Sequence, residues 1–481
     1  MAIATTGGGT MAIDSDVVVI GGGLAGISAA LAAADAGAKT RLVTANQSTL
    51  RQASGLIDVM GYPPDAAGTD ASQRGAPART DGGPVADPFE HIPDLPEGHP
   101  YERVGVDAVR DALAAFDEVV EGYTGEHTDA NALVPTNGGA IKPTARYPVH
   151  TADGLASDDR DALLVGFESL TDFDAPLAAE HLLAAGVPFA VEGVTVSFPG
   201  ELRADAKTTR FADLLENDEI PAAKGGTSSG GTGGGAGGGR AGAVHRTRTG
   251  SCRAKLVERI DDAIDDATVD PERVGFPAVL GEDRPSAVRI DLSDRLGMPV
   301  FEVPTGPPSL PGIRLENQLH EALEARQVWV ADGQAVVDFT ATDGRDEDRR
   351  IEQLQVETPG GGTTPVSAEQ YVLATGGLVG RGIDSERDLV REPIFDCHVP
   401  HPEDRYDWFA DDAFGDHPFA AFGVHVDRSL RPLDADDGIE FENLRAAGSV
   451  LGGYDFAAEK SGAGVSIATG HAAGTAAAEE I

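Results

Sequence analysis

The chain has 481 residues and a formal net charge of −42, with 79 Asp and Glu against 37 Lys and Arg. Only six of the basic residues are Lys, and the acids are spread along the chain, which is typical of a protein whose self-repulsion is screened by high salt. This charge argues against a nucleic-acid partner. Cys252 and Cys397 are far apart, so the chain by itself supplies neither four thiolates for an iron-sulfur cluster nor a disulfide framework.

The first residues, 1–12, lack the charged and apolar regions of a signal peptide, and no stretch approaches 18 uninterrupted apolar residues. We therefore expect a flexible tail at 1–12 and a cytoplasmic protein. The length predicts two or three domains.

The stretch Asp16–Thr44 predicts a strand, a glycine turn, a helix and a second strand. The apolar run at 16–20 is typical of a parallel strand that is buried on both faces. A helix is expected over 24–36, and Gly37 suits the position just after its end. This order of elements is the phosphate-binding unit of dinucleotide-binding folds.

Three glycines in this unit, Gly21, Gly23 and Gly26, have the GxGxxG spacing. The first allows the tight turn, the second lets a phosphate approach the backbone, and the third lets the helix pack on the strand. The helix beginning at Leu24 and Ala25 would direct its unpaired N–H groups at that anion. The unit predicts nucleotide or flavin binding, and a glycine turn without a ligand is the alternative.

Thr44 ends the second strand, where dinucleotide-binding folds usually carry an acidic residue that holds the adenosine ribose. It therefore favours FMN, which lacks the adenosine half, with FAD held in a different way as the alternative. The small polar segment Arg51–Asp58 follows. We expect Ser54 and Gly55 to pass the flavin ring, although an ordinary polar connection is equally consistent.

Residues 63–100 are rich in Pro, Gly and Asp and predict a mobile surface loop, and residues 106–120 predict an amphipathic helix. Lys142 lies in a turn-rich stretch, and Arg146 follows closely. Because cations are scarce in this chain, both are candidates for binding an anionic substrate. Pairing with the abundant carboxylates is the alternative.

The middle of the chain predicts alternating strands and helices. Strands are expected at 162–167, 187–198 and 276–280, helices at 175–185, 251–266 and 312–325, and hairpin or meander pieces at 328–339 and 350–358. The Gly-, Ser- and Thr-rich segment 224–242 predicts a flexible insertion without chemistry, because so little side chain offsets its ordering entropy.

A second informative stretch is the apolar strand Tyr371–Leu373, which ends in Ala374, Thr375 and Gly376. Such small residues allow the backbone to pass close to a flavin. Arg381 follows shortly and is a candidate for contacting a phosphate or a flavin oxygen. A surface ion pair is the alternative.

The third informative stretch is Asn443–Tyr454, which carries Gly448 in a glycine turn, followed by Gly462, Gly464 and Val465 at the start of a C-terminal helix. In flavoproteins of this layout the positive end of that helix points at the flavin N1 and C2 carbonyl. There it stabilises anionic reduced flavin by on the order of 1 kcal/mol.

Four histidines, His398, His401, His417 and His425, precede this stretch. Any of them could take the hydroxyl proton of a substrate, but a histidine near a turn more often has a structural role. The sequence does not identify the catalytic base. No metal-ligand spacing emerges from these histidines, so no metal is expected.

These motifs together predict an α/β protein. Its Rossmann-like flavin-binding domain is discontinuous, with parts at 13–62 and 365–481, and a loop insertion is expected at 63–100. A second, inserted region of helices and strands is expected at 101–364.

The chain resembles the B subunit of the anaerobic glycerol-3-phosphate dehydrogenases, flavoproteins of the two-dinucleotide-binding type. The resemblance rests on IGGGLAGISAAL with the following SGLID, on residues 135–144, on residues 300–312, and on AAGSVLGGYD at 446–455. The last of these motifs is the most specific. Residues 63–100 and 224–242 depart from the resemblance as insertions.

The resemblance implies a subunit that holds FMN, in a membrane-associated complex with an FAD-containing A subunit and an iron-sulfur C subunit. That complex oxidises sn-glycerol 3-phosphate to dihydroxyacetone phosphate and passes electrons to quinone. The chain would then be peripheral at the inner face of the membrane through its partners. The alternatives are a non-catalytic electron-relay or assembly subunit of that complex, and an independent flavin oxidoreductase that acts on another hydroxy acid.

Overall fold

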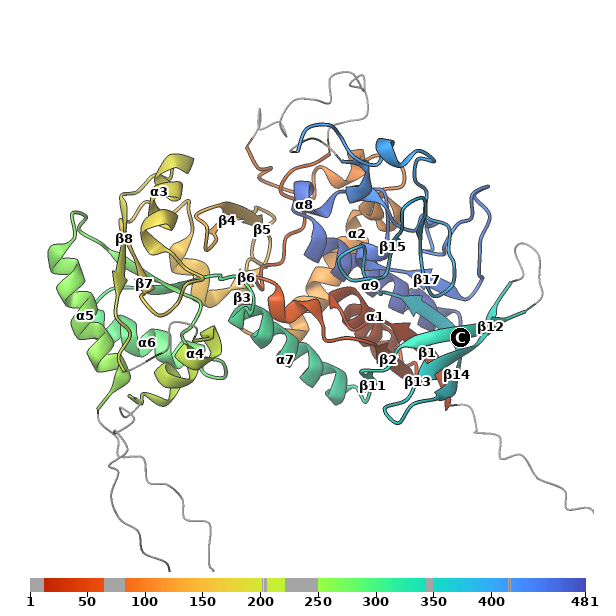
Figure 1. Ribbon diagram of the computed structural model, residues 1–481, viewed down its shortest axis with the longest axis horizontal. Coiled ribbons are helices and arrows are strands. Elements are labelled where there is room, and N and C mark those ends of the chain that lie inside the picture. The colour runs from red at the N-terminus through yellow and green to blue at the C-terminus, as the bar shows by residue number, and fades with distance from the viewer. Residues whose placement is uncertain are drawn as a thin grey trace, which may run out of the picture. The chain divides into compact units, whose positions relative to one another are not determined.

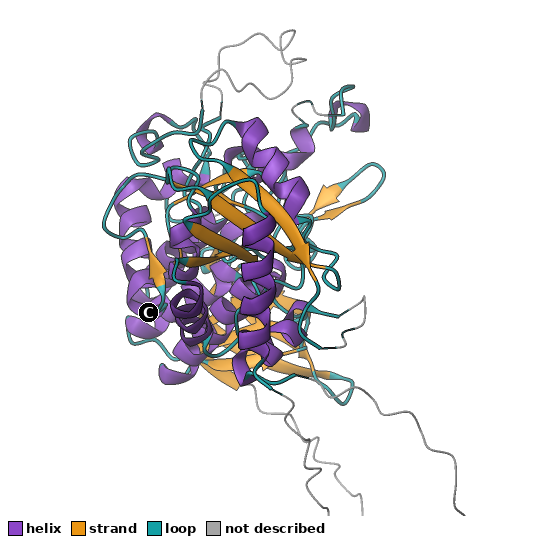
Figure 2. Ribbon diagram, turned by 90° about the vertical axis from the view of Figure 1, so that its left-hand side faces the viewer, coloured by secondary structure: helices purple, strands orange, loops and turns teal. Residues whose placement is uncertain are grey.

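The computed structural model describes residues 13–64, 83–200, 202, 206–220, 250–342, 349–413, 415 and 417–481. The chain divides into two compact units. Unit 1 contains Met1–Leu133, Lys142–Val149 and Leu315–Ile481, and unit 2 contains Val134–Ile141 and His150–Arg314. The described residues form both helices and strands (Figure 2). The tail expected at 1–12, residues 65–82 of the expected loop, and the insertion expected at 224–242 lie outside the described residues.

One sheet forms the core of unit 1, with strand order β11-β2-β1-β14-β13-β12 and β17 beside β14 (Figure 1). Neighbouring strands are parallel from β11 through β2 and β1 to β14, and β17 is also parallel to β14. The remaining strands, β13 and β12, continue from β14 as an antiparallel meander. The strands are β1 (Ile13–Ile20), β2 (Thr40–Thr44), β11 (Trp329–Asp332), β12 (Val336–Ala341), β13 (Ile351–Glu357), β14 (Thr363–Leu373) and β17 (Leu444–Ala446).

The principal helices of this unit are α1 (Leu24–Asp35), α2 (Pro100–Val119), α7 (Leu310–Ala325) and α9 (Gly462–Glu479). In α7, the residues from Leu315 onward belong to unit 1. The last helix, α9, packs along both α1 and α2 (Figure 1). A Cβ atom on Gly470 would lie 2.3 Å from the carbonyl oxygen of Ala25, so the two helix backbones are in direct contact. This contact joins the two ends of the chain in one layer.

A separate parallel sheet forms the core of unit 2, with strand order β10-β9-β7-β8. Its strands are β7 (Ala162–Phe167), β8 (Val191–Val196), β9 (Arg273–Pro277) and β10 (Val300–Val303), and its helices are α3 (Ala175–Ala185), α4 (Thr208–Asn217), α5 (Cys252–Asp266) and α6 (Pro285–Leu296). Stacked rings of Phe167, Phe211 and Phe276 fill its core.

Shorter elements complete the chain. They are η1 (Thr49–Gln52), η3 (Ile92–Asp94), β3 (Tyr123–Thr124), β4 (Ala132–Pro135), β5 (Ile141–Thr144), β6 (Tyr147–Pro148), η4 (Val149–Gly154), β15 (Asp384–Ser385), β16 (Val390–Arg391), η5 (Arg405–Asp407), η6 (Pro418–Ala421), η7 (Gly448–Val450) and α8 (Phe456–Glu459).

The predicted elements with strong local signals are confirmed. Strand β7 and helix α3 have the predicted bounds, α1 ends within one residue of its predicted end, and the three elements of the phosphate-binding unit are present in order. Helix α2 begins earlier than predicted, at Pro100, and Gly105 interrupts it with φ of 81°. A glycine tolerates this conformation, which side chains disfavour.

The structure differs from the predictions for the middle of the chain in several places. The strand expected at 276–280 is β9 at Arg273–Pro277, because the apolar residues after Pro277 are buried in the following loop. The hairpin or meander pieces expected at 328–339 and 350–358 are confirmed in part, because β12 and β13 pair in antiparallel, whereas β11 pairs in parallel with β2. Helices α4 and α6 and strand β10 have no counterpart among the expected elements. Unit 2 is also smaller than the inserted region expected at 101–364, because residues 101–133 and 315–364 belong to unit 1.

Candidate functional site

The glycine turn after β1 is shaped by contacts that exclude side chains. Gly21 has φ of +119°, and a Cβ atom there would lie 2.1 Å from the carbonyl oxygen of Ala374. A Cβ atom on Gly26 would lie 1.8 Å from the carbonyl oxygen of Gly21. Two of the three motif glycines are therefore required by close packing, and the turn is held against the end of β14.

Gly23 differs from its neighbours because a Cβ atom there would meet nothing within 4 Å. It is the N-cap of α1, with φ of −79°, and no side chain caps the helix. The first turn of α1 also carries no acidic residue. The positive end of α1, with the N–H groups of Leu24 and Ala25, is thus left for an anion from outside the chain.

The two other small-residue motifs meet beside this turn. A Cβ atom on Gly448 would lie 2.5 Å from Cβ of Ala25 in α1. Gly377 N donates to Ser449 Oγ at 3.3 Å, which links the segment after β14 to η7. Ala374 N also donates to Ile20 O at 2.8 Å. The predicted convergence of three segments that are far apart in the sequence is therefore present in unit 1.

The start of α9 is bound by Asp58, the last residue of the SGLID motif, to which the sequence assigned no role. Ala463 N donates to Asp58 Oδ1 at 2.9 Å, and Gly464 N donates to the carbonyl oxygen of Asp58 at 2.7 Å. The N–H groups of Ala463 and Gly464, at the helix end that was expected to face the flavin, are thus engaged within the protein. A Cβ atom on Gly464 would lie 2.3 Å from Oη of Tyr101, which explains the glycine at that position.

Lys142 completes this arrangement, since its Nζ lies 2.9 Å from Asp58 Oδ2. The Asp58 side chain is 6% exposed and the Lys142 side chain 23% exposed, so the carboxylate is buried and the lysine side chain is partly exposed. The carboxylate therefore has two positive partners, the ammonium and the N-terminal end of α9.

A buried polar network lies next to this pair. Glu459 Oε2 accepts from Ser461 Oγ at 2.9 Å and lies 3.1 Å from His99 Nε2. Tyr101 Oη donates to Val59 O at 2.7 Å. Burial, together with the charges of Glu459 and Asp58, raises the pKa of Tyr454 far above its ordinary value, so its hydroxyl stays protonated. This network fixes the loop that contains Asp58.

Two hydroxyl groups in this region are buried without a hydrogen-bond partner among the described residues. They are Thr375 Oγ1, at the end of β14, and Tyr454 Oη. Buried polar atoms are rarely left unpaired in native proteins, so such atoms mark positions where a ligand or water supplies the partner.

The end of β2 has an acidic neighbour on the adjacent strand. Thr44 Oγ1 donates to Asn46 O at 2.8 Å, so its hydroxyl is engaged locally. Asp332, at the end of β11, is the register partner of Thr44 in the parallel pair β11–β2. The carboxyl edge of this sheet therefore carries a carboxylate one strand away from Thr44.

Comparisons with known proteins agree with this geometry. A family model described as an FAD binding domain matches residues 16–465. The chain is 58% identical over 471 residues to the probable anaerobic glycerol-3-phosphate dehydrogenase B subunit of Halobacterium salinarum, which covers 98% of this chain and 99% of the relative. The chain belongs to this B-subunit family. The family member of Pectobacterium atrosepticum is 27% identical over 473 residues, covering 94% of this chain and 96% of the relative.

As a member of the B-subunit family with an FAD binding domain, the chain is a flavin-binding protein. The residues of unit 1 fit such a cofactor on two observations. The open space at Gly23 leaves room for a phosphate at α1, and Thr375 Oγ1 is a buried hydroxyl without a partner among the described residues.

The predicted flavin-ring segment before Asp58 is held by backbone contacts. Gly55 has φ of +73°, and its carbonyl oxygen accepts a hydrogen bond from Tyr123 Oη at 2.6 Å. Ser54 Oγ accepts from Leu56 N at 3.4 Å. Both residues are thus placed by the fold, and their contact with the ring stays a prediction.

The two arginine candidates for substrate binding differ. Arg146 is buried, its Nε donates to Asp117 at 2.9 Å, and its Nη1 donates to the carbonyl oxygens of Gly125 and Ala145. We therefore assign Arg146 a structural role, in line with the alternative considered from the sequence. Arg381 is exposed, has φ of 63°, and forms no ion pair with the described residues. It stays a candidate.

The histidines before the last motif have mainly local partners. His401 Nδ1 lies 2.6 Å from Val399 O, and His417 Nδ1 accepts from Ala410 N. Burial lowers the pKa of His425, with smaller contributions from Arg103 and His398. Over the described ranges, no group of three or more His, Cys, Asp or Glu side chains could hold a metal ion. Also within those ranges, none of the helices has the length and apolar character needed to cross a bilayer.

Proposed function

We propose that this chain is the flavin subunit of a membrane-associated glycerol-3-phosphate dehydrogenase complex that oxidises sn-glycerol 3-phosphate to dihydroxyacetone phosphate. The observation that carries the proposal is the convergence of Gly21, Ala374 and Gly448 on one end of α1, in a chain of the B-subunit family. A flavin bound there would supply two-electron oxidation of the carbinol carbon.

The protein's own residues would hold the cofactor and keep water away. The N–H groups of Leu24 and Ala25 would bind its phosphate at the uncapped end of α1. The small residues Ala374, Thr375 and Gly376 would let the backbone approach the ring, and the unpaired hydroxyl of Thr375 would supply a hydrogen bond. The tight packing of these segments would exclude bulk solvent.

Lys142 is a candidate for binding the phosphate group of an anionic substrate. Its side chain is partly exposed, and its partner carboxylate, Asp58, also accepts a hydrogen bond from the start of α9. A phosphate group near Lys142 would compete with Asp58 for this ammonium. Arg381 would add a second cation from its exposed turn.

The proposed flavin is FMN. The support for it is Thr44, whose hydroxyl is engaged with Asn46 O and offers no carboxylate to an adenosine ribose. The alternative is FAD, with Asp332 in the role of the ribose carboxylate, since it is level with Thr44 on the neighbouring strand.

The remaining components would come from partner subunits. We infer an FAD-containing A subunit and an iron-sulfur C subunit, which would pass electrons to quinone and attach the chain to the inner face of the membrane. The two cysteines, Cys252 and Cys397, are both buried as free thiols, which agrees with a cluster located in another subunit.

An anaerobic titration tests the proposal. The purified chain, alone and with its partners, is mixed with glycerol 3-phosphate while the visible flavin absorbance is recorded, and glycerol, which lacks the phosphate, is the matched control. Bleaching of the flavin in the isolated chain by glycerol 3-phosphate, and not by glycerol, supports oxidation in this chain. Flavin that only a chemical reductant bleaches supports the electron-relay or assembly alternative. Bleaching by another hydroxy acid but not glycerol 3-phosphate supports an independent oxidoreductase, and a chain without flavin refutes all three.

A further inference from the structure

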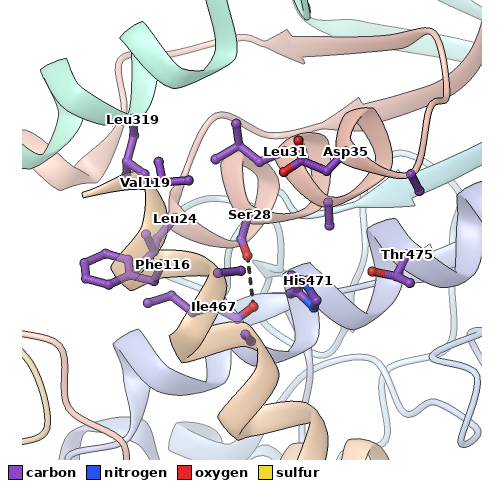
Figure 3. A pocket seen from close by; sticks show the side chains of 14 residues that line it. Leu24, Ser28, Leu31, Asp35, Phe116, Val119, Leu319, Ile467, His471 and Thr475 are labelled. Atoms are coloured by element: carbon purple, nitrogen blue, oxygen red, sulfur yellow. Dashed lines mark hydrogen bonds between the residues drawn. The ribbon is translucent and has the colours of Figure 1, made fainter. Parts of the chain in front are cut away.

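Unit 1 contains an apolar groove on the helix layer, distinct from the flavin-site residues described above. It is lined by residues of α1, α2, α7 and α9 and has a volume of about 260 Å³ (Figure 3). Along α1 it runs from Leu24 to Ala36, which corresponds to about 18 Å at 1.5 Å per residue. The backbone of Leu24 belongs to the phosphate-binding turn, but its side chain lines the groove.

The groove is open because alanines occupy positions at which packed helices usually have larger side chains. Ala32 and Ala36 on α1 and Ala112 and Ala115 on α2 all line it. Protein interiors are close-packed, with few voids larger than a water molecule. The volume here approaches the lower end of the range of about 300–1,000 Å³ that is usual for small-molecule sites.

The two ends of the groove differ in polarity. In Figure 3, Leu24, Phe116, Val119 and Leu319 gather at one end, and the polar side chains lie towards the other. Ser28 also lines the groove, but its Oγ donates to Ile467 O at 3.0 Å and is satisfied.

The polar end offers two groups that can bind a ligand. His471 and Thr475 lie one helical turn apart on α9, and neither side chain forms a hydrogen bond with the described residues. Burial lowers the pKa of His471, so the imidazole is neutral near pH 7. A neutral imidazole can donate to a carbonyl oxygen or accept from a hydroxyl group.

The charges around this end act against an anion. Asp35 lines the groove, and Asp35 and Asp111 both act electrostatically on His471. Arg326 Nε donates to Asp35 Oδ1 at 2.6 Å, so this arginine is already paired. A carboxylate or phosphate head group would therefore meet more negative than positive charge.

We propose that this groove binds an uncharged amphipathic molecule, whose apolar body packs on Phe116 and Ile467 and whose carbonyl or hydroxyl group hydrogen-bonds His471. Two sources have this shared chemistry: a soluble quinone-type ring, with its carbonyl groups, and a neutral lipid-like alcohol, with a hydroxyl group on an alkyl chain. The inference goes beyond the proposed function and does not depend on a bound flavin.

Equilibrium dialysis of the full chain in molar KCl, with three probes, tests the proposal. The probes are 2-methyl-1,4-naphthoquinone for the ring, 1-decanol for the neutral chain and decanoate for a charged chain. Binding of the ring or of the alcohol supports the proposal and identifies the source, with decanoate at least tenfold weaker. Decanoate binding as tightly as decanol overturns it. If no probe binds, the proposal is also overturned, and the groove is left to a protein partner or a second copy of the chain.

Two neighbouring alanines on α2 provide a matched pair of variants. Ala115→Phe fills the groove and should abolish binding of the neutral probe, whereas Ala114→Phe lies on the exposed face of the same helix and should leave binding unchanged. Equal binding by both variants overturns the proposal. Should Ala115→Phe fail to fold, Ala36→Phe blocks the groove from an exposed position at the end of α1.

His471→Leu tests the polar contact separately. It keeps an apolar lining, removes the hydrogen bond and should weaken the neutral probe about tenfold, which is the effect of one hydrogen bond of ordinary strength. Unchanged binding in this variant would overturn the assigned role of His471. Circular dichroism of every variant verifies that the fold is intact.

Discussion

Lys142 Nζ lies 2.9 Å from Asp58 Oδ2, and the other oxygen of the same carboxylate accepts a hydrogen bond from Ala463 at the start of α9. These three residues, at positions 58, 142 and 463, are far apart in the sequence. Asp58 thus acts as the cap of the C-terminal helix and as the anchor of Lys142.

Asp58→Ala should destabilise unit 1. Loss of a helix cap costs about 1 kcal/mol, and this variant also leaves Lys142 without its carboxylate. The measurement is denaturant unfolding at fixed salt, with Asp174→Ala as the control. Asp174 caps α3 through Leu177 N in unit 2. A smaller loss for Asp58→Ala than for Asp174→Ala would contradict the double role of Asp58.

Gly23→Val should fold but fail to retain flavin. A Cβ atom at Gly23 would meet no neighbouring atom within 4 Å, so the valine side chain would enter the space in front of α1, where the phosphate would bind. Gly26→Val should instead fail to fold, because its Cβ atom would lie 1.8 Å from Gly21 O. Flavin content and circular dichroism of the two purified variants separate the effects. Flavin retained by folded Gly23→Val would show that the phosphate lies elsewhere.

Asp332→Asn should leave cofactor retention unchanged, because FMN has no adenosine ribose for this carboxylate to bind. The cofactor is released by denaturing the protein and is identified chromatographically, in the native chain and in the variant. Release of FAD from the native chain, together with reduced retention in Asp332→Asn, would instead establish the FAD alternative.

Glu440→Gln should stabilise the protein above pH 7. Burial raises the pKa of Glu440 to about 7, although His398 N donates to it. The ordinary value is 4.5, so between these values the folded state binds more protons than the unfolded state, and stability falls as pH rises. Partial exposure limits the gain at pH 8 to on the order of 1–2 kcal/mol.

The variant should have little effect at pH 4, where the native side chain is largely protonated in both the folded and the unfolded state. Unfolding free energies are measured across this pH range, and Glu442→Gln, two residues further along the chain, serves as the control. An equal gain for Glu440→Gln at pH 4 and pH 8 would show that the ionisation of this carboxyl is not responsible.

Folding should require molar salt. With a net charge of −42, the folded chain repels itself, and the Debye length falls from about 10 Å at 0.1 M to about 3 Å at 1 M ionic strength. Thermal unfolding in increasing KCl should give a rising midpoint. A midpoint that is already maximal in dilute buffer would refute the interpretation of the acidic composition.

Sequence patterns predicted the elements whose signals are local. The glycine spacing after β1, the apolar run of β7 and the periodicity of α3 each depend on neighbouring residues, and all three are confirmed. Strand β10 was missed because a short buried strand has no periodicity of its own. The parallel pairing of β11 with β2 was missed because strand pairing depends on residues far away in the chain.

The sequence by itself determined the glycine turn after β1, the family and the three small-residue motifs, since each is written in adjacent residues. Only the tertiary structure decided which side chains meet. It brought Asp58 to α9, joined Lys142 to Asp58, paired Arg146 with Asp117 and placed Asp332 beside Thr44. The physical reason is that hydrogen bonds and ion pairs depend on distances of a few ångströms, which long-range packing sets and sequence separation does not reveal.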